Sequence, residues 1–239
     1  NVGGGLDAQT ATQDIVSAMK AFDIQAEDSM KIVDRLNEVG NNYAASSEQL
    51  GEILQKSSST LAVSGDSLDQ VVAMGAAMNT ILQDASTTGS TLKVLSLRLR
   101  GAKTDLIDAG EETETMASST SKLREKIMAL TNTTGKGGFD IMVNDKEFKT
   151  TYDIMKGISS EWTKMSNVDQ AALLELIAGK NRAQGAAALI KNFAIAEDAL
   201  QSSLNSEGSA LKENETYMKG INGQLEVLKS KWQEIWDNE

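Results

Sequence analysis

The sequence predicts a mostly α-helical protein: a multi-helix bundle with one short β-hairpin at about residues 139–151 and a long C-terminal helix of heptad type. Three observations support this fold class. The 239 residues include no proline, the residue that most readily interrupts a helix. Apolar residues recur three and four positions apart in most segments, which is the period of an amphipathic helix. Convincing alternation of apolar and polar residues, which indicates a strand, is confined to one stretch.

The composition limits the chemistry that the chain can perform. Hydrophobic residues make up 40% of the chain but aromatic residues only 4%, so we expect a core of Leu, Ile, Val, Met and Ala. The absence of cysteine excludes a disulfide scaffold and thiolate chemistry. The absence of histidine removes the commonest general base and the commonest metal ligand. We therefore expect no catalytic residue, no metal site and no cofactor.

The charge pattern and the start of the sequence narrow the function further. The net charge of −11 is dispersed and leaves no basic face for phosphate backbones, so direct sequence-specific nucleic acid binding is not expected. No apolar run reaches the length of about 18 residues that a membrane span needs. The chain begins at Asn1 without a signal peptide, which indicates an internal fragment of a longer protein.

Helical spacing predicts a series of helices before residue 131. One of them begins with a capping box, in which the side chains of Ser46 and Gln49 each bond the other's backbone. It ends at Gly65, a residue suited to a left-handed helix end. The next begins at Asp66 or Ser67 and contains small residues that would let a neighbouring helix approach closely. The predicted segments are Gln9–Phe22, Ala26–Val39 (stopped by Gly40-Asn41-Asn42), Ser46–Gly65, the segment from Asp66 to Thr87-Thr88-Gly89, Thr91–Leu99 and Lys122–Leu130.

Two groups of charged residues are interpreted as solvated. The basic group lies at the end of the Thr91–Leu99 segment, where the helix dipole favours positive charge; an anion site is the alternative. The acidic group lies in GEETETMASSTS (Gly110–Ser121), which is expected to be a loop or a frayed helix. The two groups are Arg98, Arg100 and Lys103, and Glu111, Glu112 and Glu114.

A polar stretch divides the predicted helices into regions. TNTTGKGG (Thr131–Gly138) contains three glycines and is the best candidate for a hinge. Its Gly-Lys-Gly-Gly lacks the preceding glycine, the strand and the following Ser or Thr of a phosphate loop. We predict an N-terminal helical region at 1–131, a Gly-rich hinge at 132–138, a hairpin plus helical core at 139–208 and a long amphipathic helix at 209–239.

The strand pattern follows the hinge directly. Apolar and polar residues alternate from Phe139 to Asn144, a turn sequence follows, and Phe148–Thr151 returns as a second short strand. The hairpin should lie on the helices that follow, with Trp162 as its natural cover. The acidic and amide residues near the turn lack the spacing and the closing glycine of a calcium loop, so turn chemistry is favoured. They are Asp140, Asn144, Asp145 and Glu147.

Three helices are predicted after the hairpin and before residue 209. The first is Tyr152–Lys164, and the second, Asn167–Ala178, is capped by Ser166 with Asp169 and broken by Gly179. Lys180-Asn181-Arg182 is interpreted as a solvated turn, with contact to a partner as the alternative. A small-residue helix, Ala183–Leu204, completes this region.

The last segment has the clearest period in the chain. Its apolar positions fall alternately three and four apart over more than three heptads, as in a coiled coil. A continuous helix over Ser209–Asp237 would reach roughly 43 Å. The seam packs either on upstream helices of the same chain or on a partner helix, and its polar member could fix the register. The predicted helix-partner seam is Leu211, Asn214, Met218, Ile221, Leu225, Leu228, Trp232 and Ile235.

The order of these elements resembles a known family. A short hairpin is followed by a helix ending in Trp162, then by LLELIAGKNRAQGAAALIKN and NSEGSALKEN. This order resembles the core region of the tail tape measure proteins of long-tailed phages and prophages. DRLNEVGNNYAASSEQLGEILQKSSSTLAVSGDSLDQVVAMGA (Asp34–Ala76) is similar to an earlier part of the same family, and together the matches cover roughly Asp34 to Trp236. None of these motifs is a catalytic signature.

The resemblance implies a structural and assembly protein. Such a protein would occupy the tail tube lumen, set the tail length and leave ahead of the DNA at infection, after assembly in the host cytoplasm. Its partners would be the tail tube protein, distal tail and tail assembly proteins, with self-association through the seam. The alternative is a helical-bundle scaffold or a signalling coiled-coil module, which would show heptads throughout; here they are clear only after Ser209.

Overall fold

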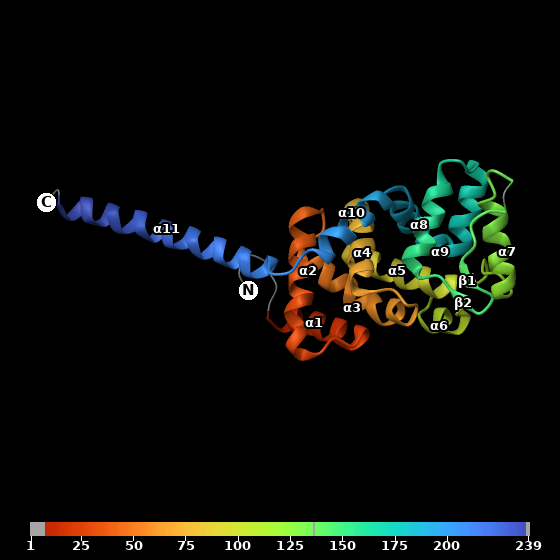
Figure 1. Cartoon of the computed structure of the whole chain (residues 1–239), viewed down its shortest axis with the longest axis horizontal. Helices are drawn as coiled ribbons and strands as arrows, with labels where there is room; N and C mark the ends of the chain where they lie inside the picture. Colours follow the sequence, from red (N-terminus) through yellow and green to blue (C-terminus); the bar gives the residue numbers. More distant parts are fainter. Residues whose placement is uncertain (1–7, 136, 238–239) are drawn as a thin grey trace.

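A computed structural model describes residues 8–135 and 137–237 and confirms the mostly α-helical fold class. Within these residues it contains eleven α-helices, one 3-10 helix and one two-stranded antiparallel sheet (Figure 1). The elements are α1 (Ala8–Phe22), η1 (Ala26–Asp28), α2 (Ser29–Asn42), α3 (Ser47–Val63), α4 (Leu68–Leu82), α5 (Ala85–Leu99), α6 (Lys103–Asp108), α7 (Thr120–Leu130), β1 (Met142–Asn144), β2 (Glu147–Phe148), α8 (Thr151–Trp162), α9 (Asn167–Lys191), α10 (Phe193–Leu204) and α11 (Ser209–Asp237).

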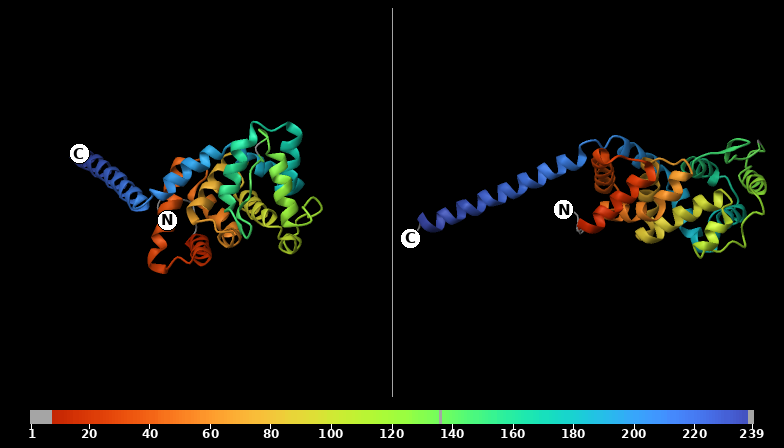
Figure 2. Two further views of the ribbon diagram at one scale, coloured as in Figure 1. Left: turned by 45° about the vertical axis from the view of Figure 1, so that its right-hand side comes forward. Right: turned by 90° about the horizontal axis from the view of Figure 1, so that it is seen from below.

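The molecule consists of a helical body and one projecting helix. Helices α1 to α10 and the small sheet form the body, and α11 leaves it as a single rod that points away (Figures 1 and 2). Inside the body, helices distant in sequence contact one another: α10 lies against α4 and α2, and α9 lies against α5 and α4. The body therefore begins and ends at the face from which α11 projects.

The predicted helix caps are confirmed. Ser46 accepts a hydrogen bond from the N–H of Gln49, whose side chain bonds back to the Ser46 N–H, and this forms the capping box of α3. Ser67 and Gln70 form a second box at the start of α4. Ser166 accepts from the N–H of Asp169 at the start of α9. The local sequence thus determines where these helices begin.

Two predicted helix ends are wrong. Helix α2 does not stop at Gly40 but continues to Asn42. The Thr87-Thr88-Gly89 stretch lies inside α5, and the preceding helix ends earlier, at Gln83, whose φ is 51°. Asp84 begins α5 because its carboxylate accepts a hydrogen bond from the N–H of Thr87. A carboxylate cap at the new start outweighs the weak helix propensity of the threonines and the glycine.

The prediction that Ala183–Leu204 is one helix is wrong. The chain is interrupted at Asn192, which ends α9 and begins α10. Its side-chain amide donates to the carbonyl oxygen of Ala188 at 2.8 Å. This bond satisfies a carbonyl at the helix end, because Asn readily bonds to nearby backbone groups. The predicted break at Gly179 is confirmed: its φ of 70° and ψ of 173° interrupt α9.

The hairpin is present but shorter than predicted. Met142 pairs with Phe148 and Asn144 with Glu147 in the antiparallel pair of β1 and β2. At the turn, the Asn144 side-chain oxygen accepts a hydrogen bond from the N–H of Lys146 at 2.9 Å, which confirms the predicted turn chemistry. Trp162 is buried in the core at the end of α8, and its role as the cover of the hairpin stays a prediction.

The core consists of the residue types that the composition indicates, and glycines allow its helices to approach closely. Ile53 of α3 lies at the centre of this packing. A Cβ at Gly75 of α4 would be 3.0 Å from Ile53 Cγ2, and a Cβ at Gly89 of α5 would be 3.0 Å from the Ile53 carbonyl oxygen. Contacts of this length leave no room for a side chain at either position.

The buried apolar residues on both sides of residues 132–138 belong to one cluster. It includes Ile32 and Leu92 before this stretch and Ile158 and Leu189 after it. The division of the chain at the Gly-rich hinge stays a prediction about how the two regions behave when they are separated.

Asp14 of α1 is a buried carboxyl group. It lies against Gly51 of α3, where a Cβ would be 2.6 Å from its carboxylate oxygen. Burial raises the pKa of Asp14, and the negative charges of Glu52 and Glu48 raise it further. A folded-state pKa above the unfolded value means that ionisation of Asp14 destabilises the fold as the pH rises through that pKa.

The close approach at Gly89 is tested by Gly89→Ala. We expect a loss of about 1–3 kcal/mol in the free energy of unfolding, because the methyl group meets Lys56 Cβ and the Ile53 backbone. The measurement is urea unfolding followed by circular dichroism. Gly220→Ala in α11 is the matched control, since an added Cβ there meets nothing within 4 Å. A Gly89 variant as stable as the control would contradict the close contact.

The pKa of Asp14 gives a pH-dependent prediction. Asp14→Asn should raise the melting temperature at pH 7, and the gain should decline below the folded-state pKa of Asp14 and vanish below its unfolded-state pKa. Asp84→Asn is the control, for which we expect the opposite change in stability at pH 7. Hydrogen bonds from Thr87 lower the pKa of Asp84, so its neutral variant should be less stable at pH 7 and equal to the parent in acid. Equal pH profiles for the two variants would contradict this assignment.

Candidate functional site

The projecting helix α11 begins at a carboxylate of the body. The two oxygens of Asp34 in α2 accept hydrogen bonds from the N–H groups of Gly208 and Ala210, both at 3.0 Å. These N–H groups have no partner within their own helix, and the positive end of the helix dipole lies there. Asp34, which is buried, therefore caps α11 from a position more than 170 residues earlier in the chain.

A second set of contacts fixes the first turns of α11 on α2. The Ser209 hydroxyl donates to Glu38 at 2.7 Å and accepts from the side-chain amide of Asn37 at 3.0 Å. One turn later, the amide of Asn41 donates to Glu213 at 2.9 Å. All three partners lie along one side of α2 (Ser29–Asn42). The direction in which α11 leaves the body is therefore determined by side chains and not by a flexible link.

The predicted helix-partner seam lies on α11. Leu211, Met218 and Leu225 are 61%, 46% and 49% exposed, respectively. Asn214 is also exposed and Ile221 is half-buried. The side chains of the remaining seam positions, Leu228, Trp232 and Ile235, lie outside the described residues. For the first five positions, packing on upstream helices of the same chain is not observed. Their contact with a partner helix stays a prediction.

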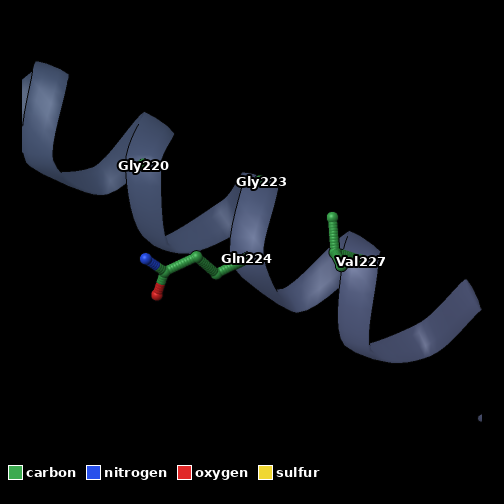
Figure 3. A pocket seen from close by; sticks show the side chains of 4 residues that line it. All are labelled: Gly220, Gly223, Gln224 and Val227. Atoms are coloured by element: carbon green, nitrogen blue, oxygen red, sulfur yellow. The ribbon is translucent and has the colours of Figure 1, made fainter. Parts of the chain in front are cut away.

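Another side of α11 carries small residues. Gly220, Gly223, Gln224 and Val227 line an open, shallow hollow of about 490 Å³ on the helix surface (Figure 3). An added Cβ at either glycine would meet nothing within 4 Å. The hollow is formed by one helix alone and does not enclose a ligand.

The prediction that Arg98 is solvated is wrong. It is the most completely buried charge of the basic group. Its side chain is 1% exposed and lies in the body beside the break in α9. The guanidinium donates to the carbonyl oxygens of Leu176, Glu175 and Glu112 and to the Thr115 hydroxyl. Burial lowers the pKa of Arg98, while nearby glutamates oppose this shift. Its hydrogen bonds satisfy the buried charge.

The expectation that the acidic stretch is solvated is wrong for two of its three glutamates, which form contacts within the body. Glu112 lies 3.6 Å from Arg98 and accepts hydrogen bonds from the Thr115 hydroxyl and the N–H of Lys180. Burial acts to raise the pKa of Glu112, but these hydrogen bonds and the Arg98 charge outweigh it and lower the pKa. Glu111 forms an ion pair of 2.6 Å with Arg182. Glu114 remains exposed.

These ion pairs also correct the interpretation of Lys180-Asn181-Arg182 as a solvated turn. Arg182 and the backbone of Lys180 bind the acidic stretch of the same chain. No sequence signal indicates this pairing, because the partners are about 70 residues apart. The remaining basic residues have different surroundings: Arg100 donates to the carbonyl oxygens of Ser64 and Lys149, and Lys103 is exposed.

The acidic residues near the hairpin are engaged in ordinary contacts. Asp140 forms an ion pair with Arg124 at 2.6 Å, and Asn144 bonds within the turn. Within residues 8–135 and 137–237, no group of three His, Cys, Asp or Glu residues could hold a metal ion. None of the helices in the described part of the chain is long and apolar enough to cross a membrane.

The geometry thus presents a helical body, a rigidly attached projecting helix and a row of exposed apolar residues along it. This arrangement can bind other helices and can span distance. A comparison with protein families supports a structural role of this kind: the model of the phage-related minor tail proteins matches residues 1–179. No solved structure matches the chain. The match covers most of the sequence, and the chain belongs to the family of phage-related minor tail proteins.

Proposed function

We propose that the chain is part of a tape measure protein, which sets the length of the phage tail inside the tail tube. In this proposal it enters the tail lumen during assembly in the host cytoplasm and is released ahead of the DNA at infection. Membership of the minor tail protein family supports a structural role in the tail. The order of helices and motifs from Asp34 to Trp236 supports the more specific assignment.

The continuous helix α11 carries the proposal. It extends over 29 residues without a break, and an α-helix converts residue number into length at about 1.5 Å per residue. Its first turns are fixed to α2 by Asp34 and Glu38. A rod with a rigid attachment transmits a defined distance, whereas a flexible link would not.

The proposed partners follow from the same arrangement. The tail tube protein would surround the rod, and distal tail and tail assembly proteins would contact its ends. The net charge of −11 is spread over the chain, which suits a molecule that must slide out of its channel instead of adhering to it. A second copy of α11 would cover the exposed seam residues Leu211, Met218 and Leu225.

Tail length tests the measuring role. Duplicating residues 210–237, which are four heptads, in the complete phage protein should lengthen the tail by about 42 Å, because helix adds about 1.5 Å per residue. Electron microscopy of purified virions measures the length. The control is a Gly/Ser-rich insertion of equal residue number in the loop at residues 132–138, which adds no continuous helix. Tails of parental length with the duplication would favour the alternative role of a helical scaffold.

Self-association tests the seam. The parent chain should show a mass that rises with concentration in analytical ultracentrifugation. Replacing Leu211, Met218 and Leu225 by Ser should abolish this rise, since it removes the apolar contact area. The matched control replaces by Ser three charged residues that lie on another side of the same helix, Lys212, Lys219 and Glu226. A parent chain that stays monomeric at high concentration would contradict the seam.

A further inference from the structure

Helix α9 is interrupted by a single residue. Gly179 has a φ of 70° and a ψ of 173°, a conformation that essentially only glycine adopts. Residues 167–178 and 180–191 on either side belong to the same helical segment. No loop separates the two halves, so a change in the backbone of one residue would join them.

Side chains from elsewhere in the body take the hydrogen bonds that the break leaves open. In an uninterrupted helix, the carbonyl of Leu176 accepts from the N–H of Lys180. Here Arg98 Nε donates to the Leu176 carbonyl at 3.2 Å, and the Lys180 N–H donates to Glu112 at 3.1 Å. Thus Arg98 caps the end of the first half, and Glu112 caps the start of the second.

The carbonyl group of the preceding residue, Glu175, also has a partner from outside α9. In an uninterrupted helix, Glu175 would accept from the N–H of Gly179. Here its carbonyl accepts from Arg98 Nη2 at 3.1 Å, and the Thr115 hydroxyl oxygen lies 3.2 Å away. We call Arg98, Glu112 and Thr115 the polar latch. Because buried backbone groups need hydrogen-bond partners, the latch offsets part of the cost of the break.

The latch also occupies the space beside the break. A Cβ at Gly179 would collide with a carboxylate oxygen of Glu112 and lie 3.0 Å from Arg98 Nη1. The two side chains, 3.6 Å apart, lie directly on the bent backbone. A straight helix at this position would require Glu112 to move away from the N–H of Lys180.

Gly179 permits the break, but the residues that flank it favour a continuous helix. Leu, Ala, Glu, Lys, Arg and Gln, which have high helix propensity, dominate the residues around Gly179. A glycine inside a straight helix costs only about 1 kcal/mol relative to alanine. The bend is therefore supported by the tertiary contacts of the latch.

We propose that α9 is a two-state element, bent while the polar latch caps the break and straight from Asn167 to Lys191 when the latch is withdrawn. In the bent state both halves lie in the body, and α9 contacts α4 and α5. Straightening turns one half away from these helices and opens the body. The proposal does not depend on the tape measure assignment. Displacement of the Gly110–Ser119 stretch, which carries Glu112 and Thr115, is the event that releases the helix.

Distance measurement between two spin labels tests the proposal. The chain contains no cysteine, so Val168→Cys and Lys191→Cys provide unique labelling sites at exposed positions. A straight helix places these positions about 35 Å apart, and the bent parent gives a shorter distance. We expect Glu112→Ala to add a population near the longer distance. Gly179→Ala should do the same, because alanine rarely adopts a φ of 70°.

Two control variants separate this effect from general destabilisation. Asp140→Ala removes an arginine–carboxylate pair outside α9. Gly135→Ala places alanine at a φ of 73° with no atom within 4 Å and lies outside the stretch that carries Glu112 and Thr115. Both should keep the parental distance. Folded Glu112 and Gly179 variants without the longer population would overturn the proposal. Loss of the folded body in both variants would also overturn it, since the bend would then be a condition of folding.

Discussion

Ile53 of α3 lies between two neighbouring helices, with Gly75 of α4 and Gly89 of α5 against it. This contact sets the spacing of α3, α4 and α5, on which the outer helices pack. A chain with 4% aromatic residues has few large side chains to fill gaps between helices. Its helices must therefore approach closely, and glycine permits this because it has no Cβ.

Carboxylates connect parts of the body that are far apart in sequence. Asp66 accepts hydrogen bonds from the N–H groups of Thr151 and Tyr152 at the start of α8. Asp34 does the same for α11, and Glu112 caps the second half of α9. Each carboxylate satisfies N–H groups that a helix start leaves open. The long-range order of the helices is thus encoded in these caps as well as in apolar packing.

The contacts at the start of α11 and those at the break in α9 have different consequences for function. At α11, Asp34 and the contacts of Ser209 fix a rod on the body, which is what a distance-setting part requires. At α9, the polar latch caps a break that Gly179 permits but that the flanking residues do not favour. The same kind of contact, a carboxylate on backbone N–H groups, attaches α11 to the body in one place and, in our proposal, holds one of two states in the other.

The sequence alone determined most of the helices, many of their starts and the heptad period after Ser209, because these depend on local propensity, capping residues and spacing. It also indicated the break at Gly179 and the turn at Asn144. The tertiary structure decided the roles of Arg98, Glu112 and Arg182, which local sequence suggested were solvated. It also decided that α11 leaves the body at Asp34. In each case the deciding partner lies far away in the sequence, so the energy of the contact exists only after the chain has folded.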